Sequence, residues 1–162
     1  MKKQIGKLGA FVMVFVLGLS VVGCGKKTID YTMNIPDFCQ AAIADAKYPQ
    51  MVSLPEKQLE IYYPELDINQ IEEFASYFED SNSVADELTV FKVKDLAYGT
   101  MVENAMKDHS ASRITFVESY NPSQVERIQN ALIMNRGSYY IYAISDDNDT
   151  VKKVFEEYCK EA

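Results

Sequence analysis

The chain has 162 residues and a formal net charge of −8, and 48% of its residues are hydrophobic. This length fits one domain with a substantial core and is too short for a two-lobed solute-binding protein. The acidic balance argues against nucleic acid as a partner, because the phosphate backbone would repel the chain.

Residues 1–23 have the features of a secretory leader. Lys2, Lys3 and Lys7 form a positive start, and the uncharged, mostly apolar run Leu8–Gly23 follows them. This run is shorter than the roughly 20 apolar residues that a membrane-spanning helix needs. We therefore predict a signal peptide that is removed.

The leader ends on Val21, Val22, Gly23 and Cys24, a pattern that resembles the bacterial lipobox, with Val21 where that motif usually has leucine. The small Gly23 would let a peptidase approach the backbone, and the Cys24 thiol can carry a diacylglyceryl group. Two acyl chains hold a protein stably on a membrane. We predict a lipoprotein on the outer face of the cytoplasmic membrane; the alternative is an ordinary signal peptide beside an incidental Cys24.

A short lipidated tether, residues 24–33, is expected before a single domain, residues 34–162. Lys26 and Lys27 follow the anchor, where anionic lipid headgroups would attract them. Removal of the leader takes away three lysines and changes the formal charge from −8 to −11. The domain itself would therefore be repelled by that surface, while the tether would keep any partner near the membrane.

The first half of the domain is predicted to hold two helices and one ambiguous segment. A helix with one apolar face is expected over residues 35–46, and a shorter helix between residues 55 and 64, where prolines bound it. Residues 67–71 have the composition of a turn. Residues 72–78 fit both helical spacing and strand alternation, and periodicity alone does not separate the two.

The second half alternates strands and helices. β-favouring residues alternate over 87–94 and predict a strand, and a long helix is expected over 99–118. Two apolar runs, 131–134 and 139–144, flank a turn and predict a β-hairpin. A final helix is expected to start at Asp146–Asp147.

Cys39 and Cys159 remain after acylation of Cys24. Outside the cytoplasm they could form a disulfide that closes a loop of more than a hundred residues. Both also fall on apolar helical faces, so the alternative is that each is a small buried hydrophobic side chain.

Tyr140 and Tyr142 lie on the same face of the predicted strand 139–144. If helices cover only one face of the sheet, this pair could form an exposed aromatic strip that binds a peptide, a glycan or an envelope protein. The alternative is ordinary cross-strand packing.

We predict no catalytic residues, no metal site and no cofactor beyond the covalent lipid on Cys24. The sequence has no zinc-protease, nucleophile-elbow, S-x-x-K or phosphate-loop motif, and its only histidine, His109, has no nucleophile in a known motif. The acidic run Asp146–Asp149 lacks the ligand spacing of a calcium loop. It is interpreted as a helix cap with acids in the first turn.

Together with the lipobox, the segments ADELTVFKVKD at 85–95 and GSYYIYAISDD at 137–147 are similar to a family of small Gram-positive lipoproteins. These lipoproteins carry an uncharacterised domain of unknown function. The resemblance covers most of residues 34–160 and implies an α+β domain in which Glu72–Phe78 is a strand. It brings no catalytic residue that could be transferred to this chain.

We therefore expect an α+β, two-layer sandwich: a four-stranded antiparallel sheet with the long helix and the C-terminal helix packed mainly on one face. The expected role is non-enzymatic binding or scaffolding at the cell envelope. The alternatives are an envelope enzyme acting on wall or lipid substrates and an accessory subunit of a membrane transporter or sensor. A deep pocket that gathers His109 with two or more carboxylates would favour the enzyme, and a shallow strip over Tyr140 and Tyr142 would favour the binder.

Overall fold

The computed structural model describes residues 29–81 and 84–162. In chain order, its strands and helices are β1 (Tyr31–Thr32), α1 (Ile35–Asp45), β2 (Met51–Ser53), α2 (Glu56–Tyr62), β3 (Ile71–Glu79), β4 (Glu87–Val93), α3 (Gly99–Val117), α4 (Val125–Gln129), β5 (Leu132–Arg136), β6 (Tyr139–Ile144), α5 (Asn148–Tyr158) and β7 (Lys160–Glu161). Short 3-10 turns at Ile68–Gln70, Leu96–Tyr98 and Pro122–Gln124 precede β3, α3 and α4.

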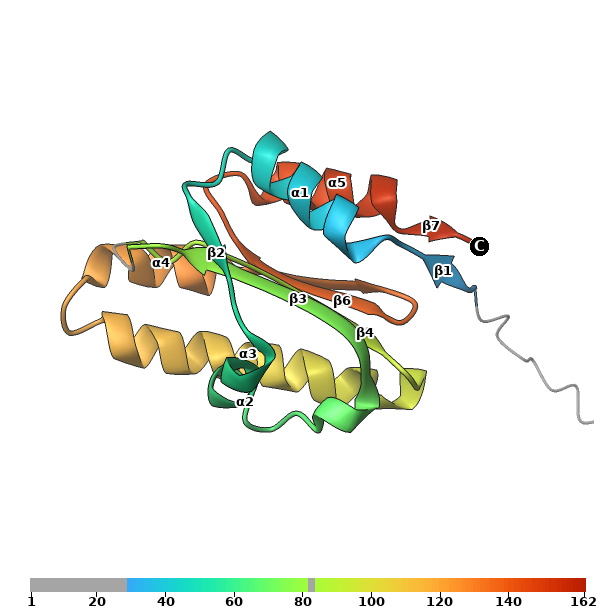
Figure 1. The fold of residues 1–162 in the computed structure, drawn as a ribbon. Helices are drawn as coiled ribbons and strands as arrows, with labels where there is room; N and C mark the ends of the chain where they lie inside the picture. Colours follow the sequence, from blue (N-terminus) through green and yellow to red (C-terminus); the bar gives the residue numbers. More distant parts are fainter. Residues whose placement is uncertain (1–28, 82–83) are drawn as a thin grey trace, which may run out of the picture.

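The larger sheet has five antiparallel strands in the order β2-β3-β4-β6-β5, and β1 pairs with β7 in a separate two-stranded sheet. Helices lie on both faces of the larger sheet, with α1 and α5 on one face and α2 and α3 on the other (Figure 1). The β5–β6 hairpin turns through Gly137 and Ser138, where Gly137 has a φ of +53° that glycine adopts without strain.

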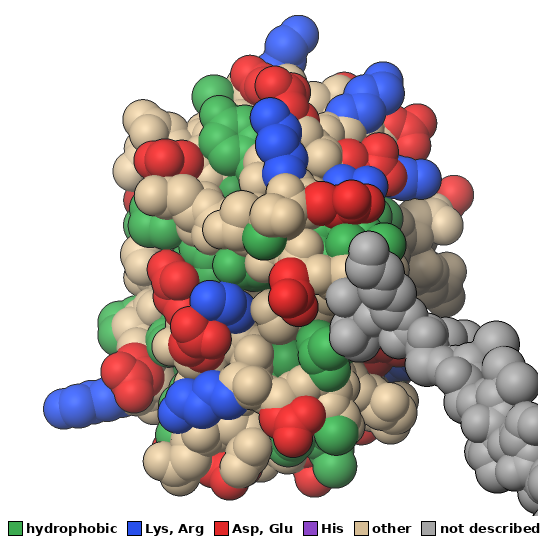
Figure 2. All heavy atoms as spheres, turned by 90° about the vertical axis from the view of Figure 1, so that its right-hand side faces the viewer, with side chains coloured by type: hydrophobic (Ala, Val, Ile, Leu, Met, Phe, Trp, Pro, Cys, Tyr) green, Lys and Arg blue, Asp and Glu red, His purple; other side chains and the backbone are tan. Residues whose placement is uncertain are grey.

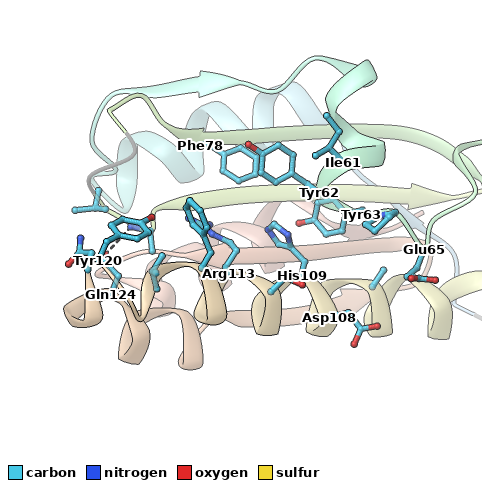
Figure 3. Close-up of a pocket in the computed structure, with 18 residues that line it drawn as sticks. Ile61, Tyr62, Tyr63, Glu65, Phe78, Asp108, His109, Arg113, Tyr120 and Gln124 are labelled. Atoms are coloured by element: carbon cyan, nitrogen blue, oxygen red, sulfur yellow. Dashed lines mark hydrogen bonds between the residues drawn. The ribbon is translucent and has the colours of Figure 1, made fainter.

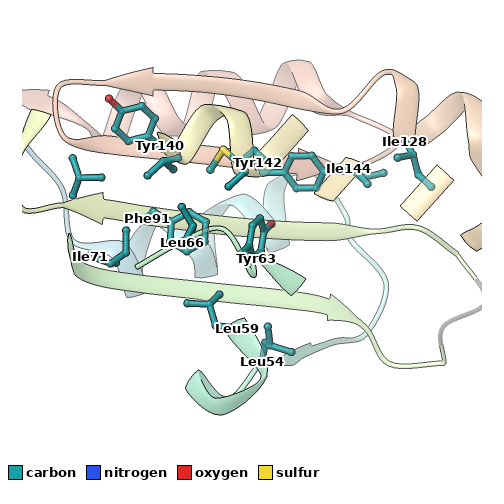
Figure 4. Packing of buried hydrophobic residues seen from close by; sticks show 14 of the residues in the cluster. Leu54, Leu59, Tyr63, Leu66, Ile71, Phe91, Ile128, Tyr140, Tyr142 and Ile144 are labelled. Carbon is teal, nitrogen blue, oxygen red and sulfur yellow. The ribbon is translucent and has the colours of Figure 1, made fainter. Parts of the chain in front are cut away.

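The two central strands have a separate hydrophobic core on each face. Leu88 and Val90 of β4 pack with Ile141 of β6 under α1 and α5. Phe91 of β4 packs with Tyr142 of β6 against α2 and α3 (Figure 4). Because both faces of β4 and β6 are buried, these strands are almost continuously apolar instead of alternating with polar residues.

The predicted fold class, α+β with an antiparallel sheet, is confirmed, but two of its details are wrong. The sheet has five strands and not four, because the three-residue edge strand β2 pairs with the end of β3. The helices cover both faces, so the sheet lies in the middle of three layers; the long helix α3 and the C-terminal helix α5 are on opposite faces (Figure 1).

The ambiguous segment 72–78 is a strand, as the resemblance implied, and extends over Ile71–Glu79. The predicted helices at 35–46, 55–64 and 99–118 and the hairpin are also present, with ends that differ by a few residues. Asp147 caps α5 by accepting a hydrogen bond from the backbone N–H of Thr150 at 2.9 Å, which confirms the interpretation of that acidic run.

Tyr140 and Tyr142 do not form the possible exposed strip, and the alternative, packing inside the fold, is what the structure has. Tyr142 is fully buried and Tyr140 is 5% exposed, because α3 covers this face of β6. The condition for an open strip, helices on one face only, is not met. Both tyrosines therefore belong to the core (Figure 4).

The structure holds Cys39 and Cys159 as free thiols, and both are buried in the core between α1, α5 and the sheet. The disulfide proposed for them is therefore not formed here. Burial raises the pKa of Cys39 to about 12 and that of Cys159 to about 11. At neutral pH both side chains are uncharged and pack as small hydrophobic groups.

Part of the segment predicted as a tether belongs to the folded domain. Tyr31 and Thr32 form β1, and Met33 is buried with its backbone N–H 3.2 Å from the Tyr139 hydroxyl. The predicted signal peptide and Cys24 lie outside the described residues. Within 29–81 and 84–162, no helix combines the length and the apolar character that crossing a bilayer requires.

The face near β1 and β7 has acidic and basic side chains interspersed with scattered hydrophobic ones (Figure 2). Arg136 joins the elements at this end. Its guanidinium stacks over Tyr31 at 5.5 Å and donates hydrogen bonds to the backbone carbonyls of Glu156 and Cys159 at 2.9 Å. The hairpin is thereby connected to β1 and to the end of α5.

Gly99, the first residue of α3, provides a test of the packing of α3 against Tyr140 of β6. A Cβ at this position would lie 1.7 Å from the Tyr140 hydroxyl and 2.6 Å from its Cζ. We expect Gly99→Ala to lower the free energy of unfolding by about 1–3 kcal/mol through overpacking, measured by urea denaturation. Adding Tyr140→Phe should recover part of the loss. The neighbouring exposed Thr100→Ala is the control, and equal effects of the two alanine variants would contradict the proposed contact.

Candidate functional site

A groove of about 920 Å³ opens between α2, the end of β3 and α3 (Figure 3). Of the nine large hydrophobic side chains that are exposed in the described part of the chain, four line it: Ile61, Tyr62, Phe116 and Tyr120. Ile61 is 74% exposed, Phe116 70% and Tyr120 55%. The three most exposed of the nine side chains therefore lie together around this groove, which is typical of a binding site.

The walls of the groove follow from local sequence. Pro64 lies just beyond α2, after which the chain returns toward the sheet. On α3, His109, Arg113 and Val117 are four residues apart and therefore lie on the same helical face. Tyr120 lies at one end of the groove (Figure 3), and its ring centroid is 5.1 Å from that of Phe116, which also lines the groove.

The floor of the groove is held by the carboxylate of Glu87, the first residue of β4. Its Oε1 accepts hydrogen bonds from the hydroxyls of Tyr63 and Thr89, each at 2.9 Å. Its Oε2 lies 2.9 Å from Nε2 of His109 and bonds to Nη1 of Arg113. Glu87 is fully buried, so one buried acid connects β4 with the loop after α2 and with two turns of α3.

Glu87 is ionised in this environment. Burial alone would raise its pKa, but the charge and hydrogen bond of His109, with Arg113 and Thr89, outweigh burial and hold the pKa below its usual range. A carboxylate only accepts, so Nε2 of His109 is the donor. Burial and the Glu87 charge raise the Tyr63 pKa well above its usual value, so Tyr63 stays protonated and donates.

The preceding residue, Asp86, forms a second ion pair at one end of the groove. Its carboxylate binds Arg127 of α4 through two hydrogen bonds of 2.9 Å, and Arg127 also lies 2.9 Å from Asp146. Arg127 further donates to Gln124, which lines the groove. Two adjacent acids at the start of β4 therefore fix the positions of both α3 and α4.

The residues that the sequence analysis considered, and the acids that lie near them, are distributed as follows. His109 lines the groove together with Glu65 and Asp108, and Glu87 lies behind it. Tyr140 and Tyr142 are in the core, and Val21, Val22, Gly23 and Cys24 lie outside the described residues. Among residues 29–81 and 84–162, no group of histidine, cysteine and acidic side chains has the geometry to hold a metal ion.

Glu87 and Arg113 were missed as site residues. A signal was present: His109 and Arg113 lie four residues apart on the otherwise apolar face of the long helix. A cation on a buried face requires an acid from another element. Glu87, at the start of an apolar strand, was a candidate for that acid, but the pairing itself depends on tertiary structure.

The buried ion pair predicts a specific pH dependence of stability. Glu87→Gln leaves Arg113 and His109 facing a neutral amide, so the free energy of unfolding at pH 7 should fall by about 3–5 kcal/mol. Because folding lowers the pKa of Glu87, its contribution is present above the usual glutamate pKa and is lost as the pH falls through the folded-state value. The difference between wild type and variant should therefore shrink below about pH 4.

Urea denaturation between pH 7 and pH 3 measures this difference. The control is Glu72→Gln, which removes the acid of the more exposed Lys92–Glu72 pair, whose atoms are 2.7 Å apart. That change should cost less than about 1 kcal/mol. Similar losses for the two variants at pH 7 would show that the Glu87 carboxylate has no special structural role.

Comparisons with known proteins identify the domain but no activity. No curated protein and no solved structure matches the chain. A family model described as a domain of unknown function, DUF4358, matches residues 44–145, more than half of the chain and the part that contains the groove residues. The chain therefore belongs to the DUF4358 family.

Proposed function

We propose that this protein is a lipoprotein of the cell envelope whose domain binds an apolar or amphipathic ligand in the groove between α2 and α3, without catalysing a reaction. The observation that carries the proposal is the clustering of Ile61, Tyr62, Phe116 and Tyr120 around a cavity of about 920 Å³. This volume falls within the range of small-molecule sites, roughly 300–1,000 Å³.

The floor of the groove supports binding by being rigid. Each oxygen of Glu87 already has two donors, so the groove-lining residues Tyr63, His109 and Arg113 are held in place before a ligand arrives. A preorganised site loses less conformational entropy when it binds.

An envelope enzyme is the alternative, and the criterion stated from the sequence favours it, because the pocket gathers His109 with two carboxylates and no strip over Tyr140 and Tyr142 is exposed. His109 lines the groove with Glu65 and Asp108 and is bonded to Glu87, an arrangement compatible with general-base chemistry. However, His109 is only 4% exposed, and no serine, threonine or cysteine of the described residues is hydrogen-bonded to it. The activated nucleophile of covalent catalysis is therefore not assembled here.

The lipid anchor is the second part of the proposal. The lipobox-like residues Val21, Val22, Gly23 and Cys24 support it, as does the similarity to small Gram-positive lipoproteins. The domain begins at β1, directly after the short segment that follows Cys24. Such an anchor would keep the groove within a short distance of the outer face of the cytoplasmic membrane.

The anchor is tested by Cys24→Ala in the full chain. Without the thiol no diacylglyceryl group can be attached, so metabolic labelling with a fatty acid should be lost and the protein should leave the sedimented membrane fraction. Cys39→Ala serves as the control, because this cysteine is buried in the folded domain. A Cys24→Ala protein that stays labelled and sedimented would contradict the anchor.

The groove is tested by placing a photo-crosslinking amino acid at Ile61 in the full chain in cells. Ile61 lies on the groove wall, whereas the control site, Lys152, is exposed on α5 on the opposite face of the sheet. We expect a small-molecule adduct, detected as an added mass on the intact protein, at position 61 and not at 152. No adduct at 61, or equal adducts at both sites, would contradict a ligand-binding groove, and recovery of a chemically altered ligand would favour the enzyme.

A further inference from the structure

We infer that the ligand carries an oxyanion, a carboxylate or a phosphate, and that Arg113 receives it at the centre of the groove. This inference rests on the proposed function, because it names the chemistry of the ligand for the same site. It concerns the side of the Arg113 guanidinium that faces away from Glu87.

One edge of the Arg113 guanidinium is unused by the protein. Its Nη1 donates to Glu87, whereas Nε and Nη2 have no partner among the described residues. A buried nitrogen without a partner would be among the buried unpaired polar atoms, and neither Nε nor Nη2 of Arg113 is, so both atoms are exposed to solvent. Arg113 lines the groove, and its side chain is 18% exposed. The Nε and Nη2 groups form the edge that donates two parallel hydrogen bonds to a carboxylate or phosphate.

The guanidinium is also fixed in position. Glu87 holds it from one side, and the ring of Phe78 lies under its Cζ at 5.6 Å. An arginine that is already ordered loses little rotamer entropy when it binds an anion, and its planar shape suits two-point recognition. Because Glu87 is paired with four donors, an anion on the opposite edge of Arg113 does not have to displace it.

The charges around the groove determine how such a ligand would lie. Glu65 and Asp108 are at one end, Tyr120 and Gln124 at the other, and Arg113 lies between them with His109 (Figure 3). With the oxyanion held at Arg113, the apolar body of the ligand should extend along the rings of Phe116 and Tyr120 and away from the charged end that Glu65 and Asp108 form.

The experiment uses the full lipidated protein in nanodiscs of zwitterionic lipid, with decanoic acid bearing a diazirine at its far end as the photolabel. The label should attach to the α3 peptide that contains Phe116, as determined by mass spectrometry. Unlabelled decanoate or decyl phosphate should compete at least about tenfold better than decanamide, which has a similar chain but no charge. The stronger of the two anionic competitors identifies the headgroup as a carboxylate or a phosphate.

Arg113→Lys keeps a cation for Glu87 but loses the two-donor edge, so competition by decanoate should weaken about tenfold. Lys107→Gln, which removes an exposed charge from the same helix outside the groove, should change nothing. If the Arg113→Lys variant does not fold, the comparison of decanoate with decanamide on the wild type still tests whether the ligand carries an oxyanion.

Equal competition by decanamide and decanoate would overturn the oxyanion inference and leave the ligand-binding groove standing. No labelling of the α3 peptide, together with no adduct at position 61, would overturn both.

Discussion

The carboxylate of Glu87 is the interaction on which the remaining structure depends most. An unpaired charge at this depth would be very unfavourable, and it is tolerated because Tyr63, Thr89, His109 and Arg113 all donate to it. These donors come from three different parts of the chain. The geometry that satisfies one buried acid therefore also sets the distance between the central sheet, the loop after α2 and the long helix, and with it the width of the groove.

Much of the fold follows from local periodicity, and the errors have a common origin. Helices and long strands were predicted because their apolar residues recur at regular spacing. β2 was missed because three residues show no period, and its pairing with β3 is a tertiary event. The burial of Tyr140 and Tyr142 under α3 was not predicted, because tyrosine occurs on both exposed and buried faces. The continuously apolar sequence of β6 nevertheless indicated that both faces of this strand are covered.

The candidate site was less accessible from sequence than the fold. Glu87 is 22 residues from His109 and 26 from Arg113, and nothing in local spacing brings them together. Predicting the site required identifying an acidic partner for Arg113, the cation on the apolar face of α3. The exposed hydrophobic side chains around the groove could not be predicted for a similar reason. Ile61 and Phe116 come from different helices, and each alone is an ordinary surface residue.

The pairing of β1 with β7 places the start of the described chain beside its C-terminus. Only two residue pairs join these strands, backed by the burial of Met33. If the domain is attached at Cys24 as proposed, a mechanical load applied through the preceding segment would strain this small ladder before it reached the five-stranded sheet. The groove, which lies among α2, α3 and β3, would keep its shape under tension that already frays the first residues of the domain.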